Sequence, residues 1–179
     1  MKLSIVSTLY KSKPFLEKFL EEMISAVDKI KIIDYEIIFV NDGSPDNSLE
    51  FLIQKKKNIP QIKIIDLARN FGHHYAIQAG LSHTKGELIF LIDNDLEVNP
   101  SFLIDCYQQM QSNKELDVVY GYQEERKGKF IESVGGKFFW WGLNKFSDVE
   151  IPKNILTERL MTKQYVQELL SLGDANLFL

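Results

Sequence analysis

The segment from Ile89 to Pro100 constrains the fold of this chain more than any other stretch. It reads Ile-Phe-Leu-Ile-Asp-Asn-Asp-Leu-Glu-Val-Asn-Pro, an apolar run that leads directly into two aspartates separated by one residue. An apolar run of this length is typical of a buried strand. Since open α/β folds bind ligands outside the carboxyl ends of their strands, Asp93 and Asp95 lie where a ligand is expected. Acidic residues after a strand also commonly form a turn and a helix start, so this pair does not decide the matter alone.

The chemistry of the two carboxylates suits a metal ion. Mg²⁺ in proteins is commonly held by one or two carboxylates, with substrate phosphates completing its coordination. Asp93 and Asp95 therefore predict a site for a divalent cation and a diphosphate group.

Apolar segments and segments of helical periodicity alternate along the chain. Strands are expected at residues 3–7, 35–40, 62–67, 87–92 and 117–121. Helices are expected from 12 onward, from 47 to about 57, through 76–80, from 99 onward and over 162–172. This alternation predicts an α/β fold with a mainly parallel sheet and helices on both faces.

Helix starts can be placed more closely at two points. Pro14 is expected in the first turn of its helix, where a missing N–H is harmless. The buried face of that helix is expected to comprise Phe15, Phe19, Leu20, Met23 and Ala26. Asn47 and Glu50 predict a capping box for the next helix.

Composition narrows the functional classes. The 179 residues are 45% hydrophobic and 26% charged, as in an ordinary globular domain. The net charge of −4 gives no reason to expect nucleic acid, and a single cysteine excludes an internal disulfide and a cysteine metal cluster. No apolar run approaches membrane-spanning length and the first residues do not read as a signal peptide, so a cytoplasmic location is expected.

Polar clusters follow three other predicted strands: Thr8-Leu9-Tyr10, Asn41-Asp42-Gly43-Ser44 and Arg69-Asn70-Phe71-Gly72-His73-His74. Asp42 could accept hydrogen bonds from a nucleobase or ribose, Tyr10 could stack on a base, and Arg69 could balance a phosphate. Asp42 also suits an Asx turn, and Tyr10 a tyrosine packed against its own domain. Adjacent side chains diverge, so His73 and His74 are not expected to share one metal. Because parallel strands end at one edge, these clusters should converge on one crevice with the aspartate pair.

The order of these motifs resembles the family-2 glycosyltransferases of the GT-A fold. Within that family, Arg-Asn-Phe-Gly-His followed by Ala79-Gly80-Leu81 is similar to the polyprenyl-phosphate branch, which includes dolichyl-phosphate mannose synthase. Arg159-Leu160-Met161-Thr162 resembles a later motif of the branch. The resemblance covers essentially the whole chain. It implies one GT-A domain over 1–179, with a nucleotide-binding half at 1–122 and an acceptor-side half at 123–179.

The resemblance also implies roles for individual residues. Asp95 would hold the metal, Mg²⁺ or Mn²⁺, and Asp93 would lie near the diphosphate or sugar. Arg159 would reach the diphosphate or the acceptor phosphate, and these three form the expected catalytic set. The expected substrate-binding set is Thr8, Tyr10, Asp42, Arg69 and Asn94, with Asp42 at the base.

Three positions depart from the family pattern. Glu97 stands where many relatives have glutamine, Gln123 where many have arginine, and Thr157 where several have aspartate. The last two fall on the acceptor side, so they bear on the acceptor more than on the donor. The apolar ending at Asn176-Leu177-Phe178-Leu179, without a helix stop signal, indicates truncation at the carboxyl end.

The activity implied is inverting, metal-dependent transfer of a sugar from a nucleotide-diphosphate sugar to a membrane-associated acceptor, with polyprenyl phosphate favoured. Two alternatives stay open: elongation of a glycan on a hydroxyl, with Glu97 as a weak candidate base, and a non-catalytic module that binds nucleotide-sugar. A nucleotidyltransferase is less favoured because no glycine-rich phosphate loop lies near the amino terminus.

An aromatic segment, Lys137 to Phe146, places four consecutive rings between lysines. Tryptophan suits the membrane interface, so this segment suggests peripheral association with the inner face of the cell membrane. The alternative is packing on the sheet or on a second copy of the chain in a homo-oligomer.

Overall fold

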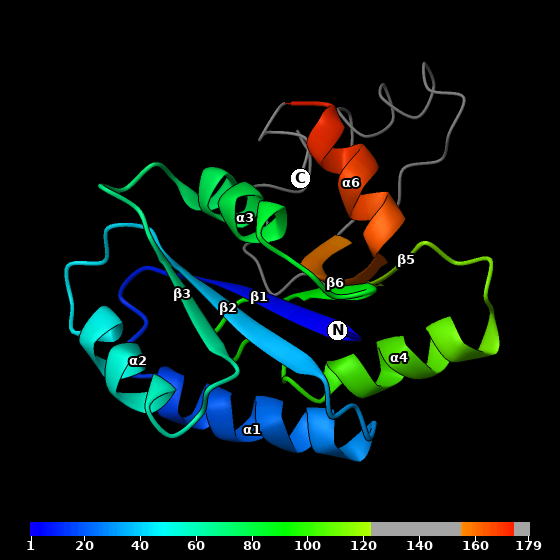
Figure 1. Ribbon diagram of the computed structural model, residues 1–179, viewed down its shortest axis with the longest axis horizontal. Helices are drawn as coiled ribbons and strands as arrows, with labels where there is room; N and C mark the ends of the chain where they lie inside the picture. The colour runs from blue at the N-terminus through cyan, green and yellow to red at the C-terminus, as the bar shows by residue number, and fades with distance from the viewer. Residues whose placement is uncertain (123–154, 174–179) are drawn as a thin grey trace, which may run out of the picture.

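The computed structural model describes residues 1–122 and 155–173. Within them a six-stranded sheet is covered by helices on both faces (Figure 1). The strands are β1 (Leu3–Leu9), β2 (Tyr35–Asn41), β3 (Ile62–Asp66), β4 (Leu88–Leu91), β5 (Val118–Tyr122) and β6 (Ile155–Thr162). The helices are α1 (Leu16–Lys29), α2 (Ser48–Lys56), α3 (His73–Ser82), α4 (Phe102–Ser112) and α6 (Lys163–Ser171).

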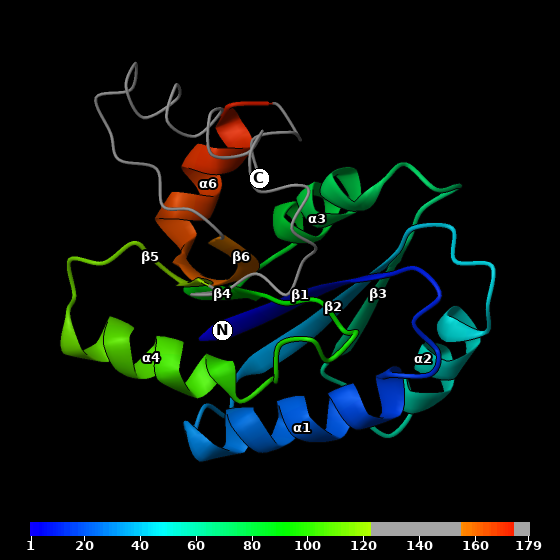
Figure 2. The same cartoon turned by 180° about the vertical axis from the view of Figure 1, so that it is seen from behind.

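Two layers of helices enclose the sheet, as the alternating pattern predicts. Helices α1, α2 and α4 cover one face, and α3 and α6 cover the other (Figures 1 and 2). Phe19, Phe39 and Phe90 are fully buried on the α1 side of the sheet. Ile38 and Met161 belong to a separate core cluster under α3 and α6. The predicted mainly parallel α/β sheet with helices on both faces is confirmed.

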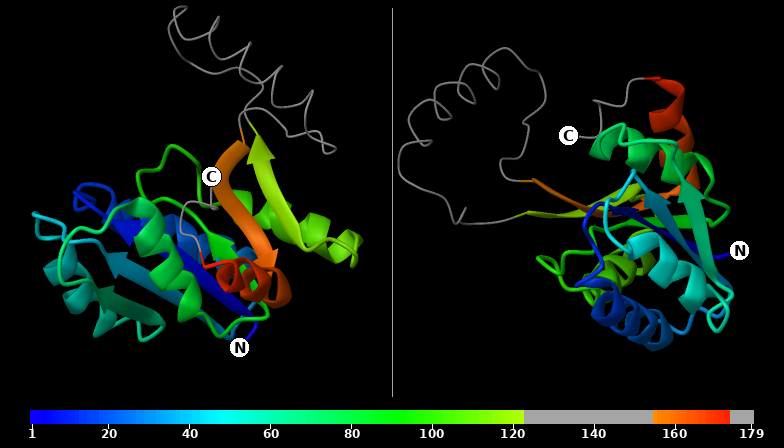
Figure 3. Two further views of the ribbon diagram at one scale, coloured as in Figure 1. Left: turned by 90° about the horizontal axis from the view of Figure 1, so that it is seen from above. Right: turned by 90° about the vertical axis from the view of Figure 1, so that its left-hand side faces the viewer.

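Strand order departs from chain order at two points, where β4 lies beside β1 and where β6 lies beside β4. The sheet runs β3-β2-β1-β4-β6-β5, and its first four strands are mutually parallel. β6 lies between β4 and β5 and is antiparallel to both, beside β5 in the left panel of Figure 3. No strand was expected at 155–162, so the insertion of β6 is a feature that the sequence pattern missed.

Two expected helix starts are wrong in detail. α1 begins at Leu16, after a turn in which the Phe15 N–H donates to the carbonyl of Ser12. Phe15 therefore stays 39% exposed, although the rest of the predicted face is buried. Asn47 makes no side-chain cap on α2. Asp46 takes that place and accepts the Ser48 N–H at 3.2 Å.

Asp46 also ties two loops of the carboxyl edge together. It accepts the Lys13 N–H at 3.0 Å and the Ser44 hydroxyl at 2.6 Å, and Ser44 in turn accepts the Lys11 N–H at 2.8 Å. The loops after β1 and β2, which lie together on the left of Figure 1, are thus held in register. Burial alone would raise the pKa of Asp46, but these hydrogen bonds outweigh it and lower the pKa.

Two further expectations concern association with a membrane. Among the described residues, no helix is long and apolar enough to span a bilayer. The aromatic segment from Lys137 to Phe146 lies outside the described residues.

Candidate functional site

A small cavity opens at the carboxyl edge of the sheet. Its volume is about 170 Å³, and it is lined by Thr8, Leu9, Tyr10, Asp42, Asn70, Gly72 and His73. These residues come from the end of β1, the end of β2 and the loop between β3 and α3. The fold therefore brings three of the four predicted polar clusters together around one hollow.

Asp42 holds the wall of this cavity in place. Its side chain is buried, and its two carboxylate oxygens accept the Phe71 N–H at 2.7 Å and the Gly72 N–H at 3.0 Å. Gly43 has φ +62°, and a Cβ there would lie 2.5 Å from the Asn70 nitrogen, so only glycine allows the two loops to approach. The expected Asx turn exists but belongs to Asn41, whose side chain accepts the Ser44 N–H.

Tyr10 and Arg69 occupy different positions. Tyr10 lines the cavity and is 52% exposed, so its ring is accessible to a ligand. Arg69 does not line the cavity. Its guanidinium carbon lies 4.2 Å from the centre of the Phe71 ring, and it donates to the Asn70 carbonyl at 3.3 Å.

The aspartate pair follows β4 at the same edge. Asp95 is exposed and its Oδ1 accepts the Glu97 N–H at 3.0 Å, so it forms part of a turn as well. Leu96 has φ +64°, a strained backbone for a leucine and a feature typical of functional loops. Asn94 is buried and donates to the Ser7 hydroxyl at 3.0 Å and to the Thr8 carbonyl. Asn94 thereby fastens the aspartate loop to the end of β1.

Asp93 carries an unusual carboxyl group. Burial, with repulsion from Asp95 and Glu97, raises the pKa of Asp93 to about 6. Its Oδ1 lies 3.8 Å from Nε2 of His73. Burial lowers the pKa of His73, against opposing effects of the nearby carboxylates of Asp42, Glu158 and Asp95.

Glu158 is a residue that sequence reasoning missed. It lies on β6 one residue before Arg159, and it is 5% exposed. Burial raises the pKa of Glu158, and the charges of Asp93 and Asp95 raise it further. In the sequence it is only an acidic residue next to Arg159. Its proximity to the aspartates follows from the pairing of β6 with β4.

Arg159 lies on β6, beside the strand that leads to the aspartates. It pairs with Leu91 across the sheet, and its guanidinium donates to the carbonyls of Thr157 at 2.9 Å and Leu156 at 3.3 Å. Its side-chain hydrogen bonds to described residues thus stay within its own strand.

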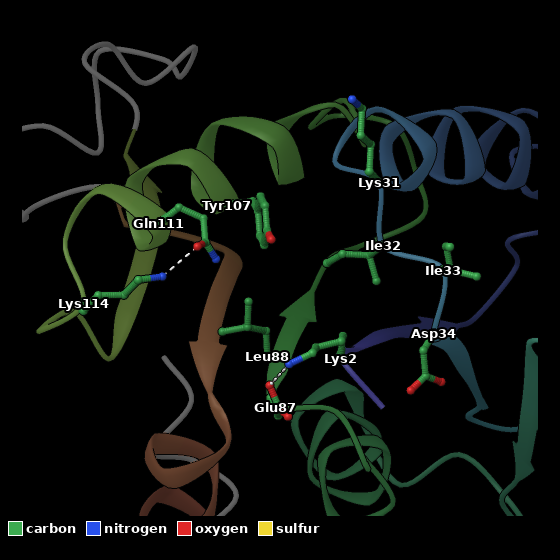
Figure 4. Close-up of a pocket in the computed structure, with 10 residues that line it drawn as sticks. All are labelled: Lys2, Lys31, Ile32, Ile33, Asp34, Glu87, Leu88, Tyr107, Gln111 and Lys114. Atoms are coloured by element: carbon green, nitrogen blue, oxygen red, sulfur yellow. Dashed lines mark hydrogen bonds and ion pairs between the residues drawn. The ribbon is translucent and has the colours of Figure 1, made fainter.

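A larger hollow, of about 590 Å³, lies at the opposite edge of the sheet (Figure 4). Several of its polar groups already have partners within the protein: Lys2 pairs with Glu87 at 2.8 Å, Asp34 with the amino terminus at 2.9 Å, and Lys114 donates to Gln111 at 2.6 Å. None of the predicted site residues lines it.

Comparison with known proteins identifies the family. Residues 4–169 match the model described as Glycosyl transferase family 2. The chain belongs to this family. A glycosyltransferase-named protein of Mycobacterium tuberculosis (strain CDC 1551 / Oshkosh) is 42% identical over 94% of this chain and 49% of its own length. The bactoprenol glucosyl transferase of Shigella phage SfX is 26% identical over the whole chain and 58% of its own length. The chain thus spans about half the length of these family-2 relatives.

Solved structures show the GT-A fold of the family. The mannosyltransferase PcManGT of Pyrobaculum calidifontis, in complex with GDP-Man and Mn²⁺, has a TM-score of 0.61 at 15% identity, over 94% of this chain and 46% of that one. Glucosyl-3-phosphoglycerate synthase of Mycobacterium tuberculosis, with Mn²⁺, UDP and phosphoglyceric acid, has a TM-score of 0.63 at 17% identity, over 91% and 56%.

The side chains of the aspartate loop provide part of the ligand set that a divalent cation needs. Among the described residues, no three His, Cys, Asp or Glu side chains cluster as a complete ligand set. Two aspartates provide the one or two carboxylates that Mg²⁺ takes when substrate phosphates supply the other ligands. This donor set therefore suits a metal that arrives with, or is completed by, a nucleotide.

Proposed function

We propose that this family-2 domain transfers a sugar from a nucleotide-diphosphate sugar to a membrane-associated acceptor, with polyprenyl phosphate favoured, in a metal-dependent and inverting reaction. The observation that carries the proposal is the position of the small cavity. His73 lines this cavity, and its Nε2 lies 3.8 Å from Oδ1 of Asp93. A nucleoside in the cavity would direct its phosphates towards the aspartates.

The donor side has the stronger support. Two proteins of the same fold were solved with Mn²⁺ together with GDP-Man or UDP. In this chain Asp95 and Asp93 would hold Mg²⁺ or Mn²⁺, and Tyr10 and Asp42 would border the base. When bound, the metal offsets the charge that develops on the nucleoside diphosphate as it leaves.

The chain's own residues define the rest of the mechanism. Asn94 and the strained turn at Leu96 hold the aspartates at the mouth of the site. Asp93, with a pKa of about 6, is mainly ionised at pH 7 and can take part in cation binding. A phosphate acceptor is already ionised near neutral pH, so no strong base is required for its attack. Attack opposite the leaving diphosphate would invert the anomeric centre.

The acceptor is inferred from the relatives. The bactoprenol glucosyl transferase of phage SfX, 26% identical, bears a lipid acceptor in its name. A polyprenyl phosphate would bring this domain to a membrane surface.

Glu158 favours a second candidate, the elongation of a glycan on a hydroxyl. A hydroxyl acceptor requires a general base, and a buried carboxyl with a raised pKa near the reacting groups suits that task. Glu158 meets this description better than Glu97, which is exposed. A turnover assay that offers polyprenyl phosphate and oligosaccharide acceptors separately discriminates the two functions.

The donor site is tested by thermal-shift measurements with UDP-, GDP- and CDP-sugars, each with and without Mn²⁺. A ligand that binds only the native state raises the melting temperature by mass action. Asp95→Asn keeps the size of the side chain but loses the anionic ligand, so the Mn²⁺-dependent part of the shift should disappear. Asp28→Asn, at an exposed position on α1, is the matched control. An unchanged Mn²⁺ dependence in Asp95→Asn would contradict the metal assignment. A separate turnover assay distinguishes an enzyme from a module that only binds nucleotide-sugar.

A further inference from the structure

We propose that His73 is a donor-binding residue whose Nε2–H contacts the diphosphate of the nucleotide-sugar. This inference rests on the proposed function of the site and adds a specific residue to it. His73 is singled out by its position in the fold, because its side chain lines the cavity and also approaches the aspartate pair.

The ring is held in a defined orientation. His73 is the first residue of α3 and lines the cavity together with Thr8, Tyr10 and Asp42. Its Nδ1 lies 3.1 Å from the Thr8 hydroxyl, at the end of β1. Its Nε2 faces Oδ1 of Asp93 at 3.8 Å, just after β4. One side chain thus reaches from the wall of the hollow to the aspartate loop.

The contacts favour one tautomer. A carboxylate facing Nε2 favours the proton on that nitrogen, which leaves Nδ1 to accept a hydrogen bond from the Thr8 hydroxyl. At 3.8 Å, however, Nε2 is too far from Asp93 for a direct hydrogen bond. Among the described residues, the Nε2–H therefore has no hydrogen-bond acceptor, while 41% of the side chain stays exposed to a ligand.

A phosphate oxygen is the acceptor that fits this position. A nucleotide with its nucleoside in the cavity and its phosphates on a metal at Asp93 and Asp95 must place its diphosphate across the gap that the ring borders. The expected alternatives are turned elsewhere: Arg69 lies against Phe71, and Arg159 donates to its own strand.

The test separates a hydrogen bond to the diphosphate from a packing role in the cavity wall. His73→Phe keeps a ring of similar size but removes the donor. His73→Gln removes the ring but keeps an amide N–H at about the reach of Nε2. His83→Phe is the matched control, because His83 is exposed just after the other end of α3, and its side-chain hydrogen bonds to described residues are with Ala79 and Ser82 of that helix.

Calorimetric titration in Mn²⁺ with each nucleoside and its diphosphate, namely uridine and UDP, guanosine and GDP, and cytidine and CDP, provides the readout. For the base that the wild-type protein prefers, His73→Phe should weaken diphosphate binding about tenfold and leave nucleoside binding unchanged. His73→Gln should recover most of the loss, and His83→Phe should bind as wild type does.

Each other outcome has a definite meaning. Equal losses for nucleoside and diphosphate in His73→Phe, or full diphosphate affinity in that variant, overturn the inference while the proposed function stands. Failure of His73→Gln to recover affinity, when His73→Phe has lost it, also overturns the donor role. A wild-type protein that binds none of UDP, GDP and CDP overturns the proposed function and the inference with it.

Discussion

Buried carboxylates at the two edges of the sheet have opposite electrostatic surroundings. At the amino edge, Glu36 is fully buried, forms an ion pair with Lys63, and accepts the Ser4 hydroxyl at 2.6 Å and the Lys85 N–H at 2.9 Å. At the carboxyl edge, Asp93 and Glu158 are at least partly buried beside another acid, Asp95. No salt bridge joins either of them to a lysine or arginine among the described residues.

The pKa shifts follow this difference. Burial alone would raise the pKa of Glu36, but its hydrogen bonds and its ion pair lower it below the ordinary value. Burial and like charges raise the pKa of Asp93 to about 6 and also raise that of Glu158. A carboxylate balanced within the protein stabilises the fold. Carboxylates left without a cation mark a place where a ligand supplies the missing charge.

Cavity size and the proposed site point to different edges of the sheet. The hollow at the amino edge, about 590 Å³, is larger than the cavity of about 170 Å³ near the aspartates. Lys2, Asp34 and Glu87 at the larger hollow already take part in ion pairs, whereas the smaller cavity lies beside acids that have no lysine or arginine partner among the described residues. This difference in charge is why the proposed site is placed at the smaller cavity.

The largest effect is expected at the amino edge. Glu36→Ala should lower the free energy of unfolding by about 3 kcal/mol, because it leaves buried hydrogen-bond partners unsatisfied. Nucleotide binding should not change. Urea denaturation checks the stability, with Glu87→Ala, an exposed acid at the same edge, as a control that should behave as wild type.

The depressed pKa of Glu36 means that its contribution to the free energy of unfolding is present at neutral pH and is lost in acid as that pKa is crossed. A variant as stable as wild type would show that the two edges do not differ in this way.

Asp42 should give an intermediate effect, because it belongs to the functional edge but is satisfied by backbone N–H groups. Asp42→Ala should weaken nucleoside diphosphate binding by roughly 1–3 kcal/mol, with or without metal. The amides of Phe71 and Gly72 should also exchange hydrogen faster in the ligand-free protein. Calorimetry and hydrogen exchange measure the two effects, and Asp66→Ala at the end of β3 is the control. Faster exchange with wild-type affinity would reduce Asp42 to a loop-holding residue.

The smallest effect should have the opposite sign. The pKa of Asp93 is raised from 3.8 to about 6 on folding, so ionisation opposes the fold increasingly between these values and fully above pH 6. Asp93→Asn removes this penalty and should stabilise the ligand-free protein by about 1 kcal/mol at pH 8, the full linkage value being reduced by residual solvent exposure. The gain should vanish at pH 3.5. Denaturation at the two pH values measures it, and a variant that is destabilised at pH 8 would contradict the unbalanced charge at this edge.

Local pattern was sufficient for the parallel part of the fold. The apolar runs that became β1 to β4 and the apolar spacing of α1 are properties of short segments, so periodicity reveals them. Because parallel strands all end at the same edge of the sheet, Thr8, Asp42 and His73 could be expected near one another. Helix starts were less accurate, because Phe15 and Asn47 depend on hydrogen bonds made by neighbouring turns.

The sequence by itself determined the order of strands and helices as far as β5, the polar residues that follow the parallel strands, and the family. The tertiary structure decided which of those residues meet. β6 inserts between β4 and β5 and brings Glu158 to the aspartates, a contact between residues about 65 positions apart that no local pattern encodes. It also decided that Asp42 binds backbone N–H groups and that Arg69 lies against Phe71 instead of in the cavity. The physical reason is that periodicity reports which side of an element is buried, whereas contacts at a site depend on how separate elements pair and pack.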